Sequence, residues 1–196
     1  MFKKILTLTL LTTTLFLSGC GSASQSSSKS IETTIDDFTY SIDDTGNLSL
    51  LKYTGKNSTL KIESSYDIEG TNYPVTNLNN FQIGIGNRSV KTVIISEGIT
   101  ELNYSIFNSC KVNKIYLPKS LSVIYDDTLA YLNEDKIDIY YGGTEDEWNT
   151  IFTEYTGTDD ENAGKKLAEK FNSALGFEYD SSKFTFHYES TIDNLY

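Results

Sequence analysis

The side chains of this sequence that could carry out acid–base or metal chemistry are few. The chain has 196 residues and a single histidine, His187. A Ser-His-Asp site would need an activated serine beside it, and the sequence contains no Gly-x-Ser-x-Gly turn. A zinc site needs clustered histidine and cysteine ligands, which one histidine and two cysteines do not supply. We therefore expect His187 to be structural, and we expect neither a metal nor a cofactor.

Carboxylates occur in adjacent groups, and a glycosidase uses two of them. The groups are Asp36–Asp37, Asp43–Asp44, Asp126–Asp127, Glu145–Glu147 and Asp159–Glu161. Each falls in an expected turn or at a helix start, where Asp and Glu serve as turn and cap residues. The last group also lacks the ligand spacing of a calcium-binding EF-hand loop. These patterns favour solvated turns, and they predict no catalytic residue.

The beginning of the sequence has the features of a secretion signal. Lys3 and Lys4 precede a short apolar stretch, which is too short for a membrane span of about 20 residues. The following Leu-Ser-Gly-Cys resembles a bacterial lipobox. That resemblance implies a diacylglycerol on Cys20, and two or more acyl chains anchor a protein stably. The alternative is an ordinary signal peptide cut near Gly19 or Ala23, which leaves a free thiol.

The second cysteine has no partner if Cys20 carries lipid. Cys110 ends the segment Phe107–Cys110, where a repeat turns back toward its next strand. Free cysteine is among the most buried residue types. We expect a buried packing thiol at Cys110.

The chain is acidic. Its formal net charge is −11, and removal of residues 1–19 with Lys3 and Lys4 lowers it to −13. A surface this acidic repels phosphate backbones, so nucleic acid is excluded as a partner. Contact with a membrane is expected only through the lipid anchor. Acidity otherwise indicates a soluble, solvated surface.

Two consecutive segments repeat one apolar pattern. Residues 90–102 (VKTVIISEGITEL) and 112–124 (VNKIYLPKSLSVI) align 22 residues apart. Val93 matches Ile115, and Ile95 matches Leu117. Leucine-rich repeats have periods of roughly 20–29 residues. The pattern predicts a stacked solenoid, an architecture that presents a surface for binding.

Weaker copies flank the two clear repeats. Leu60 and Ile62 match the first strand of the repeat, although residues 66–74 interrupt this copy. Residues 139–141 supply a later strand, 24 residues after Ile115–Leu117. At least three repeats are needed for stability. The flanking segments must therefore contribute much of the core.

Elements of other kinds are expected at both ends. Thr144 with Glu147 three residues later predicts a capping box that opens a short helix. The remaining expected elements are a β-hairpin with strands over 38–42 and 48–53 around a turn at 43–47, an amphipathic helix over 160–174 and a final strand over 184–188.

Three motifs carry a resemblance to a known family. They are Ile-x-Leu-Pro-x-x-Leu-x-x-Ile at Ile115–Ile124, a Phe-x-x-Cys turn at Phe107–Cys110 and Tyr-Tyr-Gly-Gly-Thr-x-x-x-Trp-x-x-Ile at Tyr140–Ile151. Together they are similar to the BspA-like leucine-rich repeat proteins, over roughly residues 58–190. The resemblance implies a surface protein with an adhesive or binding role. Ser96–Glu97 departs from the family, which usually has proline there, and the ligand stays open.

The predicted fold class is α+β, mainly β: a short leucine-rich repeat solenoid with an N-terminal β-hairpin cap and a C-terminal helical cap. The predicted organisation is a lipoprotein signal peptide (1–19), a flexible Ser-rich tether (20–35), the N-terminal β cap (36–57), the repeats (58–152) and the C-terminal cap (153–196).

A candidate binding patch follows from strand geometry. Side chains alternate across a strand, so residues between the inward apolar positions point outward. Ile94, Tyr116 and Tyr140 then form a row across successive strands, with Lys61 beside them; we call these four residues the outward row. Aromatic side chains are common at binding hot spots. The alternatives are that a loop or the C-terminal helix covers the row, or that it reflects β-propensity alone.

These features predict a non-catalytic, lipid-anchored protein on the extracellular face of a bacterial membrane, which mediates adhesion or protein binding. The expected partner is a protein or a glycan outside the cell. A first alternative is a glycan- or small-ligand-binding lipoprotein, which a wide concave pocket lined by aromatics would favour. A second is a surface hydrolase, which needs two convergent carboxylates.

Overall fold

The computed structural model describes residues 33–84, 86–103, 106–125, 128–129, 132, 134–154 and 181–196. The predicted signal peptide, the expected lipid-attachment residue Cys20 and the predicted helix over 160–174 lie outside these residues.

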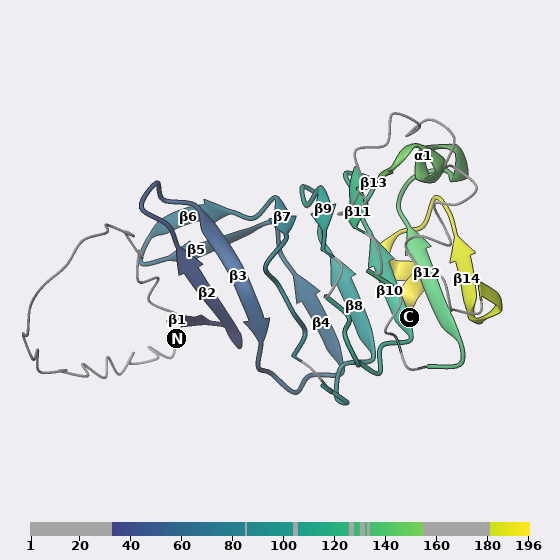
Figure 1. The fold of residues 1–196 in the computed structure, drawn as a ribbon, viewed down its shortest axis with the longest axis horizontal. Coiled ribbons are helices and arrows are strands. Elements are labelled where there is room, and N and C mark those ends of the chain that lie inside the picture. Colours follow the sequence, from purple (N-terminus) through teal and green to yellow (C-terminus); the bar gives the residue numbers. More distant parts are fainter. Residues whose placement is uncertain are drawn as a thin grey trace, which may run out of the picture.

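A five-stranded parallel sheet forms the centre of the molecule (Figure 1). Its strands are, in spatial order, β14 (Phe184–His187), β12 (Ile137–Tyr141), β10 (Lys114–Leu117), β8 (Thr92–Ile95) and β4 (Thr59–Ile62). Val93 pairs with Ile115, as the 22-residue repeat predicts. The weaker copies also fall into register, because Leu60 pairs with Val93 and Ile139 pairs with Ile115.

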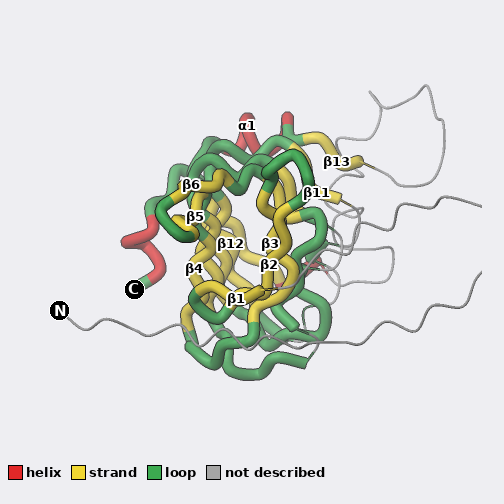
Figure 2. The backbone as a smooth tube through the Cα atoms, turned by 90° about the vertical axis from the view of Figure 1, so that its left-hand side faces the viewer, coloured by secondary structure: helices red, strands yellow, loops and turns green. Residues whose placement is uncertain are grey.

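A second parallel sheet is built from the other half of each repeat. Its four strands are, in spatial order, β13 (Phe152–Glu154), β11 (Val123–Tyr125), β9 (Glu101–Leu102) and β7 (Asn77–Leu78). From β7 to β14 the chain alternates between the two sheets, so each turn of the chain adds one strand to each sheet. Viewed along the long axis, the backbone traces a stacked outline with β4 and β12 on one side and β11 and β13 on the other (Figure 2).

Two antiparallel units interrupt or precede this alternation. An N-terminal sheet contains β1 (Thr33–Ile35), β2 (Phe38–Ile42) and β3 (Leu48–Tyr53), and its second and third strands form the predicted hairpin. The insertion at 66–74 forms a hairpin of its own, with β5 (Ser65–Ile68) and β6 (Thr71–Pro74). The sequence pattern does not predict strands in this insertion.

Helical structure is slight in the part of the chain that the structure describes. It consists of α1 (Glu145–Thr150) and the 3-10 turns η2 (Ser181–Lys183) and η3 (Ile192–Leu195). The predicted capping box opens α1: the Thr144 side chain accepts from the Glu147 backbone N–H, and the Glu147 carboxylate accepts from the Thr144 N–H. The prediction of a mainly β fold is confirmed.

The inward faces of the strands share one hydrophobic core. Buried residues from Phe38 in β2 to Ile151 after α1 belong to a single contiguous cluster, which includes Val93, Ile115 and Ile139 of the central sheet. Alternation along each strand sends the residues between them to the opposite face. The outward row lies on that face, and its apolar members Ile94 and Tyr116 belong to a separate, smaller cluster against which Tyr140 packs.

Candidate functional site

Strand register places the outward row in a line. Lys61 pairs with Ile94, Ile94 with Tyr116 and Tyr116 with Tyr140, each across a neighbouring pair of parallel strands. The next strand adds His187, which pairs with Tyr140. Five strands thus present one continuous line of side chains on the face that points away from the main core.

The centre of the outward row is covered. Ile94 is 3% exposed and Tyr116 is 7% exposed, and both pack with Leu195 of η3 in the smaller cluster. In Figure 2 the C-terminal helical turn lies outside the strand stack, on the side of β4 and β12. Of the alternatives that the sequence leaves open, a cover by another part of the chain therefore holds for Ile94 and Tyr116, because the end of the described chain folds back over them. Binding by the row stays a prediction.

One end of the row carries an aromatic pair. The rings of Tyr140 and His187 stack with centroids 4.5 Å apart and planes 14° apart. His187 Nε2 lies 2.9 Å from Asp138 Oδ1, and both side chains are 39% exposed. Burial and the nearby Asp138 carboxylate raise the pKa of Tyr140. The imidazole is thus held by a ring and a carboxylate at a half-open surface, which suits binding to an external group.

The opposite end of the row is polar. Lys61 Nζ lies 2.8 Å from Glu63 Oε1, and the Ser96 hydroxyl donates to Glu63 Oε2 at 2.8 Å. Half of the Lys61 side chain stays exposed. Ser96 stands where the resembled family has proline, and the structure gives it a function in joining β4 to the turn after β8.

A glycine makes room for the buried tyrosine of the row. A Cβ on Gly142 would lie 2.8 Å from the Tyr116 hydroxyl oxygen and 3.2 Å from the Lys119 backbone nitrogen. Burial, with a contribution from the Glu97 carboxylate, raises the pKa of Tyr116. The first glycine of the Tyr-Tyr-Gly-Gly segment is therefore explained by packing, because any side chain there would clash with Tyr116.

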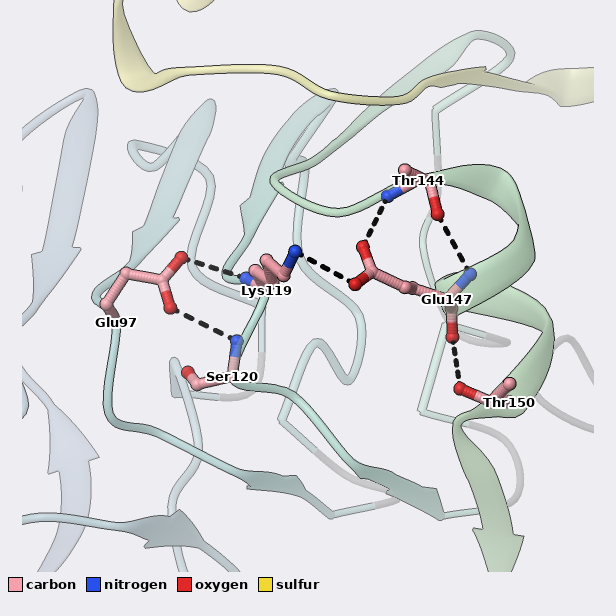
Figure 3. Close-up of polar contacts among 6 residues, drawn as sticks. All are labelled: Glu97, Lys119, Ser120, Thr144, Glu147 and Thr150. Carbon is pink, nitrogen blue, oxygen red and sulfur yellow. Dashed lines mark hydrogen bonds and ion pairs between the residues drawn. The ribbon is translucent and has the colours of Figure 1, made fainter.

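Beyond the carboxyl ends of β8 and β10, charged side chains join successive turns of the chain (Figure 3). The Glu97 carboxylate accepts from the backbone N–H groups of Lys119 at 2.9 Å and Ser120 at 3.1 Å. Lys119 Nζ in turn lies 2.8 Å from Glu147 Oε1. Sequence reasoning missed this ladder, although the spacing of Glu97 to Ser120, close to one repeat, was a signal for it.

An open surface hollow of about 440 Å³ lies beside this ladder. Its lining residues are Lys119, Leu121, Ser122, Tyr141, Glu147, Thr150 and Ile151. Lys119 and Glu147 form an ion pair within this lining. The hollow therefore offers little unpaired charge to a ligand.

The carboxylate groups that the structure describes serve local geometry. Asp43 accepts from the backbone N–H groups of Thr45 and Asn47, each at 2.9 Å, and the bond from Asn47 leads the causes that lower its pKa. Asp36 and Asp37 take positive φ angles of 44° and 69° in the turn before β2, a conformation that Asp tolerates. The groups at 126–127 and 159–161 lie outside the described residues.

Two further buried residues are Cys110, which the sequence pattern indicates, and Asn103, which it does not. Cys110 is fully buried, and burial raises the pKa of its thiol to about 11. Asn103 is also buried, and its side-chain amide donates to the carbonyls of Leu78 at 2.8 Å and Asn79 at 2.6 Å. It joins the turns after β7 and β9, so its role is in the fold.

No protein-family model matches the chain, and no curated protein matches it. Among the part of the chain that the structure describes, no helix is both long and apolar enough to cross a membrane.

Two solved structures are similar to part of the chain. A leucine-rich cell surface protein from Faecalibacterium prausnitzii is 12% identical, with a TM-score of 0.30 over 59% of this chain and 46% of that one. A leucine-rich repeat protein from Bacteroides capillosus is 18% identical, with a TM-score of 0.35 over 56% of this chain and 97% of that one. This chain thus spans less than half of the first protein. At these values the likeness supplies no argument about function.

Proposed function

We propose that this chain is a lipid-anchored bacterial surface protein of the BspA-like leucine-rich repeat type, which binds a protein outside the cell and is not a catalyst. The observation that carries the proposal is the register of the five-stranded sheet, which aligns Lys61, Ile94, Tyr116 and Tyr140 on one outer face. Lys61 and Tyr140 stay at least partly accessible on either side of the covered centre. A rigid sheet holds such side chains at fixed spacing, and aromatic anchors of this kind are frequent binding hot spots.

In this proposal the two ends of the chain close a short solenoid. The N-terminal sheet continues into the array, because the Tyr53 N–H donates to the Gln82 carbonyl and the Gln82 N–H donates to the Leu51 carbonyl. Terminal repeats need such caps, since an open end would expose the core. We assign the same capping role at the other end to the region that contains α1, β14 and η3.

Tyr140, at the partly exposed end of the row, provides the test. The purified chain is used to capture partners from host matrix proteins, and the captured protein is then titrated against Tyr140→Ala. We expect affinity to fall about tenfold or more, because aromatic anchors dominate interface energy. Tyr73→Ala on β6 is the matched control, since Tyr73 is also a partly buried tyrosine but belongs to a different sheet. Equal affinity of both variants and the unchanged chain would remove the row from the binding site.

A glycan is the second candidate ligand, and one observation favours it. The stacked Tyr140 and His187 rings lie beside the Asp138 carboxylate, which together offer an apolar face and hydrogen-bonding groups. A glycan array probed with the chain and with His187→Ala separates the two ligand classes. Binding of defined sugars that His187→Ala abolishes would replace the protein partner by a glycan.

The lipid anchor has an independent test. Each buried CH₂ of an acyl chain contributes about 0.8 kcal/mol to membrane binding, so two chains hold a protein stably. Mass spectrometry of the N-terminal peptide from the native host should show diacylglycerol on Cys20. An unmodified Cys20 would refute anchoring and leave the binding proposal standing.

A further inference from the structure

The C-terminal residues 191–196, which we call the C-terminal strap, lie over the centre of the outward row. Leu195 is 3% exposed and packs with Ile94 and Tyr116, and Ile192 and Tyr140 pack against the same cluster. This cluster is separate from the main core. The strap therefore sits on the outer face of the finished sheet.

The strap has the pattern of a small amphipathic ligand. Ile192 and Leu195 are three residues apart in a 3-10 turn, and this helix has three residues per turn, so both side chains point to one side. Asp193, Asn194 and Tyr196 are exposed. The apolar pair faces the sheet, and the polar residues between and after it face water.

The turn is organised mainly by its own hydrogen bonds. The Asn194 side-chain oxygen accepts from the Thr191 N–H at 2.6 Å, and the Asn194 N–H donates to the Thr191 carbonyl at 3.1 Å. Among the described residues, the hydrogen bond that ties the strap to the sheet runs from Lys114 Nζ to the Leu195 carbonyl, at 2.8 Å. A basic side chain satisfies the end of a helical turn in this way.

We propose that this face is a docking surface for a short peptide segment with two apolar side chains three residues apart, and that the C-terminal strap occupies it as an internal, displaceable competitor. The inference rests on the proposed binding function and names both its partner chemistry and its regulation. We call the surface under the strap the seat. Ile94 and Tyr116 form its apolar base, and Lys114 Nζ donates a hydrogen bond to the carbonyl at the end of the bound turn.

The strap is suited to displacement by its small hold on the sheet. Two apolar side chains and one lysine–carbonyl bond oppose the entropy of ordering six residues. Its advantage over a free competitor is its tether, which gives an effective concentration on the order of millimolar. A partner segment that fits the seat better, or that also contacts Tyr140 and Lys61, overcomes that advantage.

The test uses a fluorescent peptide with the sequence of residues 189–196, and the full chain purified in mild detergent. In the double variant Ile192→Ala/Leu195→Ala the internal competitor is weakened while the seat is intact. We expect the peptide to bind this variant about tenfold or more tighter than the unchanged chain, because the tethered copy no longer competes. Asp193→Ala is the matched control, since its exposed side chain lies in the same strap, and it should behave as the unchanged chain.

Two further measurements make the outcome decisive. A peptide with Asp in place of the leucine should not bind the double variant, and excess unmodified peptide should speed amide exchange of the strap in the unchanged chain. Equal peptide binding by the double variant and Asp193→Ala, with unaltered exchange, would overturn the proposal even if the double variant folds poorly. That result would leave partner capture through Tyr140 untouched, so the two proposals fail separately.

Discussion

At the scale of single residues, the buried Tyr116 of the outward row fits only because Gly142 beside it has no side chain. Gly142 faces the Tyr116 hydroxyl, and a Cβ there would lie 2.8 Å from that oxygen. The Gly142 N–H also donates to the Leu117 carbonyl at 2.9 Å, so the glycine is fixed against the neighbouring strand. The Gly142 backbone cannot move away without shifting the sheet, and the Tyr116 oxygen cannot move away without shifting its ring.

Gly142→Ala should therefore destabilise the fold. Overpacking of this kind costs about 1–3 kcal/mol, and urea unfolding measures it. Tyr116→Phe removes the oxygen that the new methyl group meets, so the double variant should recover part of the loss. If Gly142→Ala costs as much in the Tyr116→Phe background as in the unchanged chain, the contact with the Lys119 backbone nitrogen at 3.2 Å is the cause instead.

At the scale of elements, α1 is attached through both carboxylate oxygens of one side chain, Glu147. The Glu147 carboxylate closes the capping box with Thr144 and also meets Lys119 Nζ at 2.8 Å. The Lys119 hydrogen bond is the leading cause that lowers the pKa of Glu147 from its ordinary value of 4.5. Because the folded-state pKa of Glu147 is lowered, its ionised carboxylate stabilises the folded state above pH 4.5. This stabilisation is lost as the pH falls through the folded-state pKa.

Thr144→Ala should loosen this helix. The loss of an N-cap costs about 0.5–2 kcal/mol, and the fluorescence of Trp148 within α1 reports it during urea unfolding. Thr144→Ser keeps the hydroxyl that accepts from the Glu147 N–H, so it should unfold close to the unchanged chain. Equal midpoints for the Ala and Ser variants would mean that the Thr144 hydroxyl does not stabilise the helix.

Which elements the sequence predicts depends on whether their reason is local. The 22-residue spacing predicts the pairing of Val93 with Ile115, and Thr144 with Glu147 predicts the start of α1; the structure confirms both. The sequence leaves a cover over the outward row open but does not identify Ile192 and Leu195 as its source, because they stand in a polar stretch without a strand or long-helix period. The two apolar residues of this stretch find a partner surface only when the fold brings them to the sheet.

The candidate site shows the same division. Alternation predicts that Tyr116 and Tyr140 leave the inward face, and strand register brings them together. Burial of Tyr116 depends on Leu195, about 80 residues later in the chain. The stacked position of His187 on Tyr140 likewise depends on how β14 pairs with β12. Such long-range pairings are invisible to a pattern that is read in short windows.

At the scale of the whole molecule, one contiguous core connects ends that are far apart in the sequence. The cluster includes Leu50 of the N-terminal hairpin and Trp148 of α1, with every repeat between them. Stability of stacked repeats is approximately a sum of repeat and interface terms. In an array this short, the loss of an end should weaken all of its neighbours.

Leu50→Ala tests this coupling with a natural probe at the other end. Leu50 is 2% exposed, and replacing a buried leucine with alanine costs about 2–5 kcal/mol. Trp148 is the single tryptophan of the chain, packed with Tyr141 and Phe186. We expect its fluorescence midpoint in urea to fall together with the far-UV circular dichroism midpoint.

Lys52→Ala is the control for Leu50→Ala, because Lys52 lies on the same strand but is exposed to solvent. It should shift neither midpoint. If Leu50→Ala lowers the dichroism midpoint but leaves that of Trp148 unchanged, the repeats unfold separately.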